Sequence, residues 1–337
     1  MAASFARNMN LANFTCKFGD SHVMLDLFEE VVWPAFSGGK VRTFSDASYF
    51  LIDVDLRKWE QQNGVKEVAI IGRIVKNTVL ARDQIFENGK IVKNHAELAS
   101  APTSLFVLLL SNHKLLYVRE NVGAPSLNTF ASTISQFLGA SFRTWIRHVY
   151  DEKKEAGTKM TWADLLKDFP PPVLEVTPMA TESSVSAYVE KFRVVNTVEI
   201  QLIDTNHELD NLPIFGEMRE IQEKISADDI SLKTHKKGDI GLSKDGVKKL
   251  VATPAAEGNS KIVIRGTGIG GDRLVAKNDS FNVAIPIPDM PQEMGPAADK
   301  MRKRLQDQIA MGIINLKQGG AKAMEKIAGI IGRRTWS

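Results

Sequence analysis

The sequence predicts an α+β fold with two sheet-plus-helix domains, mainly antiparallel strands and a basic helical C-terminal tail. Three observations predict it. Segments rich in Val, Ile and aromatic residues are joined by short polar turns, helical periodicity appears at intervals between them, and cations gather near the carboxyl end. The chain of 337 residues exceeds the usual size of one domain, and its 43% of apolar residues can fill a real core.

The first domain is expected over residues 1–170. Strand patterns cover residues 48–55, 67–75 and 78–86, and Asn88-Gly89 then marks a tight hairpin turn. A second hairpin is expected to join residues 104–110 to residues 114–120. Because residues 104–110 are apolar on both faces of the pleat, we expect them to form a covered central strand.

A helix that covers this sheet is expected from Pro125 onward. Apolar residues follow at helical spacing, as an amphipathic helix requires: Leu127, Phe130, Ala131, Ile134, Phe137 and Leu138. We interpret Asp151–Gly157 as a charged turn and expect a short helix from Thr161 to the prolines at 170–172. Three consecutive prolines favour extended chain, so the domain boundary is placed there.

The second domain is expected over residues 171–294. Its strands are predicted at 173–179 and 191–204, a helix begins at Pro213, and a glycine-rich loop joins strands 261–265 and 273–277. Residues 295–337 are expected to form a basic amphipathic tail of two helices separated at Gly319-Gly320.

Composition and motifs exclude several classes of protein. The only cysteine, Cys16, rules out an intrachain disulfide and a cysteine-built zinc site. No apolar run is long enough to span a bilayer and no signal-peptide pattern appears, so a cytoplasmic location is expected. The histidines show no metal-ligand spacing, and no nucleophile-elbow, P-loop or kinase string is present. We therefore expect no cofactor.

The string Gly266–Gly271 has the spacing of a dinucleotide-binding loop. In that motif the third glycine opens a helix whose amide groups hold a pyrophosphate. Here a strand pattern follows, which favours a flexible hairpin tip. Arg265 and Arg273 flank the loop and remain candidates for phosphate contact.

Two aspartates suggest an alternative, enzymatic function. Asp53 and Asp55 lie two apart in a predicted strand, so their carboxylates are expected on one face, where they could share Mg²⁺ with Lys58 nearby. A metal-dependent nuclease would need a further carboxylate from elsewhere, and nothing distinguishes among the candidates Glu67, Asp83, Glu199 and Asp204. A solvated strand face is the competing interpretation.

Cations are concentrated in two segments. Residues 231–249 contain six lysines and two acids, and residues 295–337 contain nine Lys or Arg and three acids, although the whole chain carries only +3. Such clusters gain affinity for nucleic acid by releasing condensed counterions, with little dependence on sequence. The candidate DNA contacts are Lys233, Lys236, Lys237, Lys244, Lys248, Lys249, Arg265, Arg273, Lys300, Arg302, Lys303 and Arg304.

Three alternatives remain open for these segments. Each could simply be a solvated, solubilising surface. The tail, in which apolar residues alternate with cations, could lie on an anionic membrane. It could also dock onto another protein as a helix.

Two strings resemble the RexA-like DNA-binding sensors of lambda-type phage-exclusion systems. One is Leu212–Glu217 (LPIFGE) after an alternating strand; the other is the hairpin 104–120, which leads through Val122–Pro125 into a helix that ends Gln136-Phe137-Leu138. Their order and spacing agree over about residues 48–290. The amino-terminal extension, the insertion near 140–172 and the tail beyond 295 depart from the family pattern.

This resemblance implies a non-catalytic, two-domain homodimer in the cytoplasm that binds DNA with little sequence preference. It implies further that the protein senses phage DNA structures and signals to a separate membrane effector. The family supplies no active-site residue to carry over.

Overall fold

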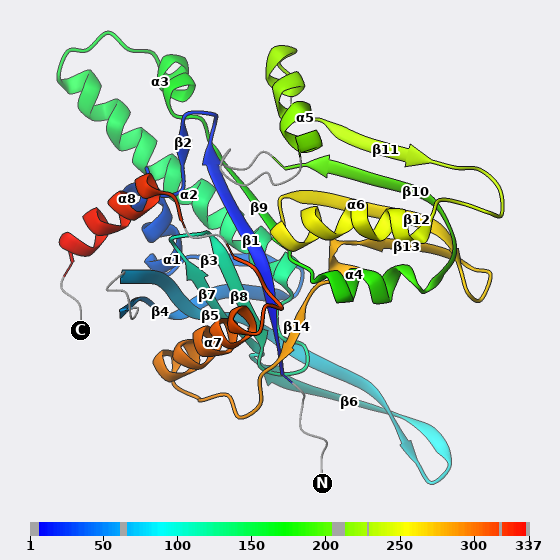
Figure 1. The fold of residues 1–337 in the computed structure, drawn as a ribbon. Helices are drawn as coiled ribbons and strands as arrows, with labels where there is room; N and C mark the ends of the chain where they lie inside the picture. Colours follow the sequence, from blue (N-terminus) through cyan, green and yellow to red (C-terminus); the bar gives the residue numbers. More distant parts are fainter. Residues whose placement is uncertain (1–6, 61–65, 204–212, 228, 317–318, 335–337) are drawn as a thin grey trace.

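The computed structural model confirms the α+β class: two antiparallel sheets, each packed against helices (Figure 1). It describes residues 7–60, 66–203, 213–227, 229–316 and 319–334. The strands of the large sheet are β1 (Asn8–Phe18), β2 (His22–Val23), β3 (Val41–Phe44), β4 (Ala47–Glu60), β5 (Lys66–Glu87), β6 (Lys90–Ser100), β7 (Thr103–Leu109), β8 (Lys114–Arg119), β9 (Pro172–Pro178) and β14 (Ala284–Pro286). Its helices are η1 (Phe28–Val32), α1 (Trp33–Ser37), α2 (Leu127–Glu155), α3 (Trp162–Asp168), α7 (Met294–Ala310) and α8 (Ala321–Gly332).

The large sheet runs in the order β14-β1-β8-β7-β5-β4-β3, with β2 and β9 also paired to β1 and β6 paired to β5. Both predicted hairpins are confirmed, because β5 pairs with β6 and β7 with β8. Asn88 and Gly89 both have positive φ, as a tight turn of mirror-image type requires. Central β7 is buried from Ser104 to Leu109, as its unbroken apolar sequence predicts.

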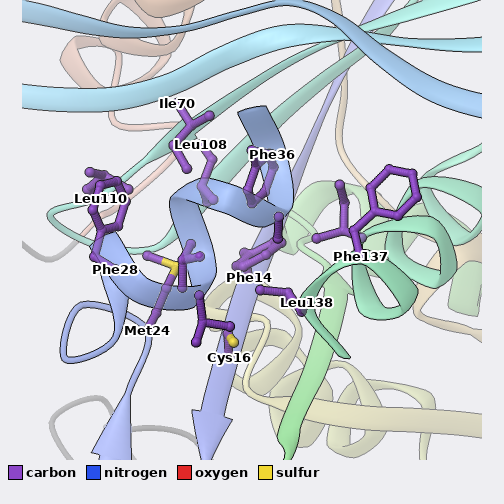
Figure 2. Close-up of a cluster of buried hydrophobic side chains, with 14 of the residues drawn as sticks. Phe14, Cys16, Met24, Phe28, Phe36, Ile70, Leu108, Leu110, Phe137 and Leu138 are labelled. Carbon is purple, nitrogen blue, oxygen red and sulfur yellow. The ribbon is translucent and has the colours of Figure 1, made fainter. Parts of the chain in front are cut away.

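Helices cover both faces of the large sheet. On one face Phe106 of β7 packs against Phe36 of α1 and Phe130 of α2, with ring centroids 5.8 and 5.1 Å apart. Figure 2 shows Phe14, Cys16 and Phe36 meeting in the core on this face, which helices α1 and α2 cover. On the opposite face, α7 buries its apolar side against the alternate residues of β7 and their neighbours.

Helix α2 is longer than the sequence predicts. The Ser126 side chain accepts from the Thr129 amide, which caps the amino end. The predicted apolar stripe is buried except at Ala131, which is half-buried. The expected turn over Asp151–Gly157 is wrong for its first five residues, because the helix continues to Glu155 with Lys153 and Lys154 favourably placed at its carboxyl end.

The expected boundaries at 170 and 294 assign β9 and β14 to the second domain, but both strands lie in the large sheet. β9 follows the three prolines but pairs with β1 over seven residues, from Phe18 opposite Pro172 to Ala12 opposite Pro178. β14 also pairs with β1, and helices α7 and α8 of the expected tail pack into the cores on the two faces of this sheet. Prolines at a strand start leave the pairing of later residues intact.

The small sheet has the strand order β11-β10-β12-β13. In the sequence, its strands lie between β9 and β14, which both belong to the large sheet. Its strands are β10 (Phe192–Leu202), β11 (Ser231–His235), β12 (Ser260–Gly268) and β13 (Arg273–Lys277); its helices are α4 (Glu182–Val189), α5 (Pro213–Lys224) and α6 (Lys244–Glu257), with the short turn η2 (Asn278–Ser280). The predicted hairpin of β12 and β13 is confirmed.

Helices α4 and α6 pack against one face of the small sheet (Figure 1). Val185 and Val189 of α4 and Val247 and Val251 of α6 join the inward residues of all four strands in one buried cluster. Beyond two bulges between Phe192 and Thr197 of β10, the inward residues alternate along the strands, so the other face of the sheet is made of the remaining residues.

A buried lysine links the two sheets. Lys114 of β8 is 5% exposed, and its Nζ donates to the Asn13 side-chain oxygen at 3.0 Å and to the Glu257 carbonyl oxygen at 3.2 Å. Glu257 is the last residue of α6, and Gly258 caps this helix with a left-handed backbone. The ammonium group therefore meets the negative end of the α6 dipole.

Candidate nucleic-acid interface

The structure does not support a shared Mg²⁺ at Asp53 and Asp55. A β-bulge falls between Ile52 and Asp55, and Asp53 has a φ of 52°, so the alternation that would place both carboxylates on one face is broken. Asp53 instead pairs with Arg73, and Asp55 accepts from the Leu56 amide. Within the described residues, no three His, Cys, Asp or Glu side chains gather around a possible metal ion; Asp204 lies outside them.

The Asp53 carboxylate is one of the partners of a buried arginine, Arg73. Arg73 is 9% exposed, and its guanidinium also contacts Glu120 and the carbonyl oxygen of Gln292, which precedes α7 in the chain. A buried arginine needs such partners because an unpaired charge in the interior is costly. By pairing with Arg73, the Asp53 carboxylate thus helps to hold the segment that leads into α7.

The predicted DNA contacts separate into distinct places on the molecule. Lys300, Arg302, Lys303 and Arg304 lie on α7 against the large sheet; Lys244, Lys248 and Lys249 lie on α6, on the covered side of the small sheet; Lys233, Arg265 and Arg273 lie on its strands; Lys236 and Lys237 follow β11. The twelve residues therefore do not form one surface.

Most of the cations on α7 hold that helix in place. Arg302 donates to the Glu67 carboxylate at 2.6 Å and lies over the Trp59 ring. Lys300 donates to the Asp289 carbonyl oxygen, and Arg304 to the carbonyl oxygen of Pro286. Lys303 is exposed.

On α6, two of the three lysines are neutralised by one carboxylate. Lys248 and Lys244 both donate to Glu190, which caps the carboxyl end of α4, with Nζ to carboxylate distances of 2.5 and 3.2 Å. Their hydrogen bonds lower the pKa of Glu190. These lysines tie α6 to α4, so they contribute little positive potential for a partner.

The face of the small sheet that α4 and α6 leave uncovered does gather cations. We call it the open face, and it comprises Thr197, Glu199, Gln201, Ser231, Lys233, His235, Lys261, Val263, Arg265, Thr267, Arg273, Val275 and Lys277. It carries five Lys or Arg side chains, of which Lys233, Lys261, Arg273 and Lys277 are exposed and Arg265 is half-buried.

The register sets the spacing of these charges. One row crosses all four strands, from Lys233 through Glu199 and Val263 to Lys277. With neighbouring strands about 4.8 Å apart, the two lysine Cα atoms lie roughly 14 Å apart across the sheet. Arg265 and Arg273 lie in the adjacent rows toward the β12–β13 turn.

The open face contains one acidic residue. Glu199 accepts from Arg265 at 2.8 Å, and this hydrogen bond lowers the pKa of Glu199. At one end of the face Lys261 bonds Glu175 of β9 at 2.7 Å, where a cavity of about 300 Å³ lies between the small sheet and the β1–β9 pair. Lys233, Arg273 and Lys277 therefore carry most of the uncompensated charge.

Sequence reasoning included Lys233, Arg265 and Arg273 but missed Lys261 and Lys277. The signal that would have found them is the period of two in KIVIR and RLVAK. Lys261 and Arg265 alternate with buried Ile262 and Ile264, and Arg273 and Lys277 alternate with Leu274 and buried Ala276. The segments richest in cations include the helices α6 and α7, whereas the cations of the open face are those that alternate with apolar residues within strands.

Two other candidates carry no chemistry here. Gly266 and Gly268 belong to β12 and β13 follows the turn, so the glycine-rich string is a hairpin tip, as predicted. A Cβ at Gly266 would lie 2.0 Å from the Val194 carbonyl oxygen, which explains the residue without a ligand. Burial raises the pKa of the Cys16 thiol to about 12, so it is no nucleophile at neutral pH.

The apolar side of the tail packs into the protein itself. Ile327 and Ile330 of α8 are buried in the large core, Lys326 pairs with Asp26, and Arg334 pairs with Glu29 and lies over Trp33. This packing occupies much of the apolar surface that a membrane-surface or partner-docking helix would use, although Met311 and Ile313 remain exposed. In the described part of the chain, no helix has the length and apolar content to cross a membrane.

No protein-family model matches the chain. A search of curated proteins likewise finds no significant match.

Proposed function

We propose that the protein binds DNA through the open face of its small sheet, by contacts to the phosphate backbone and with little dependence on sequence. The observation that carries this proposal is the gathering of five cations and one acid on one uncovered antiparallel sheet face. Lys and Arg at such a density release counterions from a polyanion, and this term dominates non-specific binding.

The composition of the open face favours duplex over single-stranded DNA. Single-stranded DNA is held largely by aromatic side chains on which its bases stack. No Phe, Tyr or Trp is present among the open-face residues, all of which the structure describes. Its polar remainder, such as Thr267, Ser231 and Gln201, can donate hydrogen bonds to phosphate oxygens.

The biological role that we propose is that of a non-catalytic, cytoplasmic sensor in phage exclusion or antiphage defence, which signals to a separate membrane effector. The support for this role is the resemblance of residues 48–290 to RexA-like sensors. A phosphate-binding face suits such a sensor, because it responds to the presence of DNA rather than to its sequence.

The test is a salt titration of binding to a short labelled duplex, read by fluorescence anisotropy. Replacing Lys233, Arg273 and Lys277 together by Gln should weaken binding at least about tenfold and reduce the slope of log affinity against log salt by about three, to the same extent on unrelated sequences. The matched control replaces Lys249, Lys303 and Lys322 by Gln, which makes the same change in net charge on exposed residues elsewhere.

The two triple variants distinguish a site from a general effect of charge. If both weaken binding equally, the affinity comes from net charge and the open face is not the site. A duplex that shows no salt-dependent binding to the unmodified protein would reject the proposed activity altogether.

A further inference from the structure

A two-stranded ribbon projects from the large sheet with apolar side chains in solvent. β5 continues beyond its pairing with β4 and β7, and its residues 79–87 pair only with β6 among the described segments. Figure 1 shows this ribbon, in cyan, extending away from the rest of the molecule. Leu80, Phe86, Ile91 and Leu98 on it are each more than half exposed.

Such a ribbon is unusual because it has neither face covered. An isolated two-stranded hairpin is marginally stable in water, and exposed apolar residues on it indicate a partner. Cross-strand pairs place Leu80 beside Leu98 near the base and Phe86 beside Ile91 near the tip, on the same face. Apolar contacts are thus available at both the base and the tip of the ribbon.

The two edges of the ribbon differ. β6 carries a bulge, because it advances from Ala96 to Lys93 while β5 advances only from Arg82 to Gln84. Bulges interrupt the regular row of donors and acceptors and protect an edge from pairing. The other edge of the ribbon is β5 from Val79 to Glu87, which is regular. The pairing of β4 with this side of β5 ends at Ala47 opposite Thr78, and no described strand pairs with it beyond that point.

Charge on the ribbon argues for a partner like itself. Its cations, Arg82, Lys90 and Lys93, are matched by the acids Asp83, Glu87 and Glu97. A polyanion would need an excess of cations, and a strongly basic partner an excess of acids. A balanced, mixed surface suits a second copy of the same surface.

We propose that two copies of the chain associate by antiparallel pairing of their β5 edges over Val79–Glu87, around a two-fold axis at Asp83. A two-fold axis perpendicular to the sheet places the same face of each copy on the same side. Because opposite residues of an antiparallel pair point to the same side, the numbers of two opposite residues must differ by an even number. Centring on Asp83 places Leu80 opposite Phe86 of the second copy and Ala81 opposite its Ile85, each twice.

The neighbouring registers are less favourable. Centring on Arg82 places two guanidinium groups face to face and sets Leu80 against Gln84. Centring on Gln84 sets Arg82 against Phe86 and Ala81 against Glu87. The register at Asp83 opposes two carboxylates, but each already bonds the imidazole of its own His95 at 2.9 Å. Apolar cross-strand pairs stabilise a sheet, and like charges directly opposite destabilise it.

Sedimentation velocity over a range of concentrations tests the association. Leu80→Glu and Phe86→Lys should each weaken the dimer at least about tenfold, because each places a charge opposite an apolar residue twice. The double variant should recover much of the loss, because the new acid then faces the new lysine of the second copy. Ile240→Lys, which changes an 85% exposed residue away from the ribbon, is the matched control.

Cysteine cross-linking tests the register. Only residue 83 meets itself, at a Cα separation of about 4.5–5.5 Å that suits a disulfide. Asp83→Cys should therefore form a covalent dimer under mild oxidation, whereas Glu87→Cys, which faces Val79, should not. The native Cys16 is buried and does not compete.

A monomer at all accessible concentrations, or a dimer unaffected by both Leu80→Glu and Phe86→Lys, would overturn the proposal. A dimer weakened by the single variants but neither restored by the double variant nor cross-linked at residue 83 would overturn the register. These measurements contain no DNA, so their failure is separate from failure of the proposed function.

Discussion

The two sheets of this protein differ in how many of their faces are covered. The large sheet has helices on both faces, and its central strand β7 is buried throughout. The small sheet has helices on one face only, and the other presents cations at every fourth residue of β12 and β13, namely Lys261 and Arg265 on β12 and Arg273 and Lys277 on β13. The large sheet therefore holds most of the buried core, whereas the small sheet leaves one cationic face without a helix over it.

Removal of a large side chain from the covered core should have the largest effect on stability. Phe106 is fully buried between Phe36 and Phe130, so Phe106→Ala should lower the free energy of unfolding by about 3–5 kcal/mol. Val275→Ala, on the open face where the side chain is 39% exposed, should change it by about 0.5 kcal/mol or less. Chemical denaturation measures both, and equal losses would contradict the assignment of faces.

The link between the sheets gives the next effect. Lys114→Met preserves the length of the stem but removes the ammonium donor, which leaves the Asn13 side-chain oxygen and the Glu257 carbonyl oxygen without it. We expect a loss of about 2 kcal/mol in the free energy of unfolding. Hydrogen exchange should rise at the carboxyl end of α6 more than in α4. An unchanged α6 would show that Lys114 does not attach the small sheet.

Acid should weaken the attachment of α8 to the large sheet. Burial raises the pKa of Asp26, but the hydrogen bonds from Lys326 and the Val23 amide outweigh it, so the pKa lies below its ordinary value of 3.8. A lowered carboxyl pKa stabilises the docked helix above that value, and the contribution is lost as the pH falls below it.

Hydrogen exchange in α8, corrected for the intrinsic effect of pH, measures this loss between pH 6 and pH 3. Asp26→Asn should raise exchange at pH 6 and make it depend less on pH. An α8 equally protected at both pH values in the unmodified protein would contradict the role of this ion pair.

The smallest effect sharpens the role of the open face. Glu199→Gln removes its one acid and frees Arg265 for phosphate. DNA affinity near 0.15 M salt should rise roughly fivefold, with a salt slope steeper by about one. Asp245→Gln makes the same change of charge on α6 and should leave binding nearly unchanged. A fall in affinity on Glu199→Gln would show that this carboxylate assists binding.

Local patterns predicted most of the fold. The Asn88-Gly89 turn, the apolar hairpin of β7 and β8 and the helix after Pro125 each follow from dihedral preference or periodicity within a few residues. The partners of β9 and β14 could not be predicted in this way, because both pair with β1 more than 150 residues away in the chain. Pairing at such separation is decided by the tertiary structure rather than by local sequence.

The candidate site was predicted only in part, for a related reason. Lys244, Lys248 and Arg302 count as cations in the sequence, but the fold brings Glu190 and Glu67 to them. A regular strand would place Asp53 and Asp55 on one face, but the bulge in β4 breaks that alternation. The number of cations in a segment therefore predicts a binding surface less well than cations at alternate positions of a strand, because alternation places them on the same face.

The most direct test of DNA binding by the open face compares valine methyl groups on the two faces of the small sheet by NMR. Val263 and Val275 lie on the open face, and Val247 and Val251 lie on α6 beneath the covered face. On titration with duplex DNA at low salt, we expect shifts at Val263 and Val275 and nearly constant signals from Val247 and Val251. Shifts confined to α6, or DNA binding that leaves Val263 and Val275 unmoved, would contradict it.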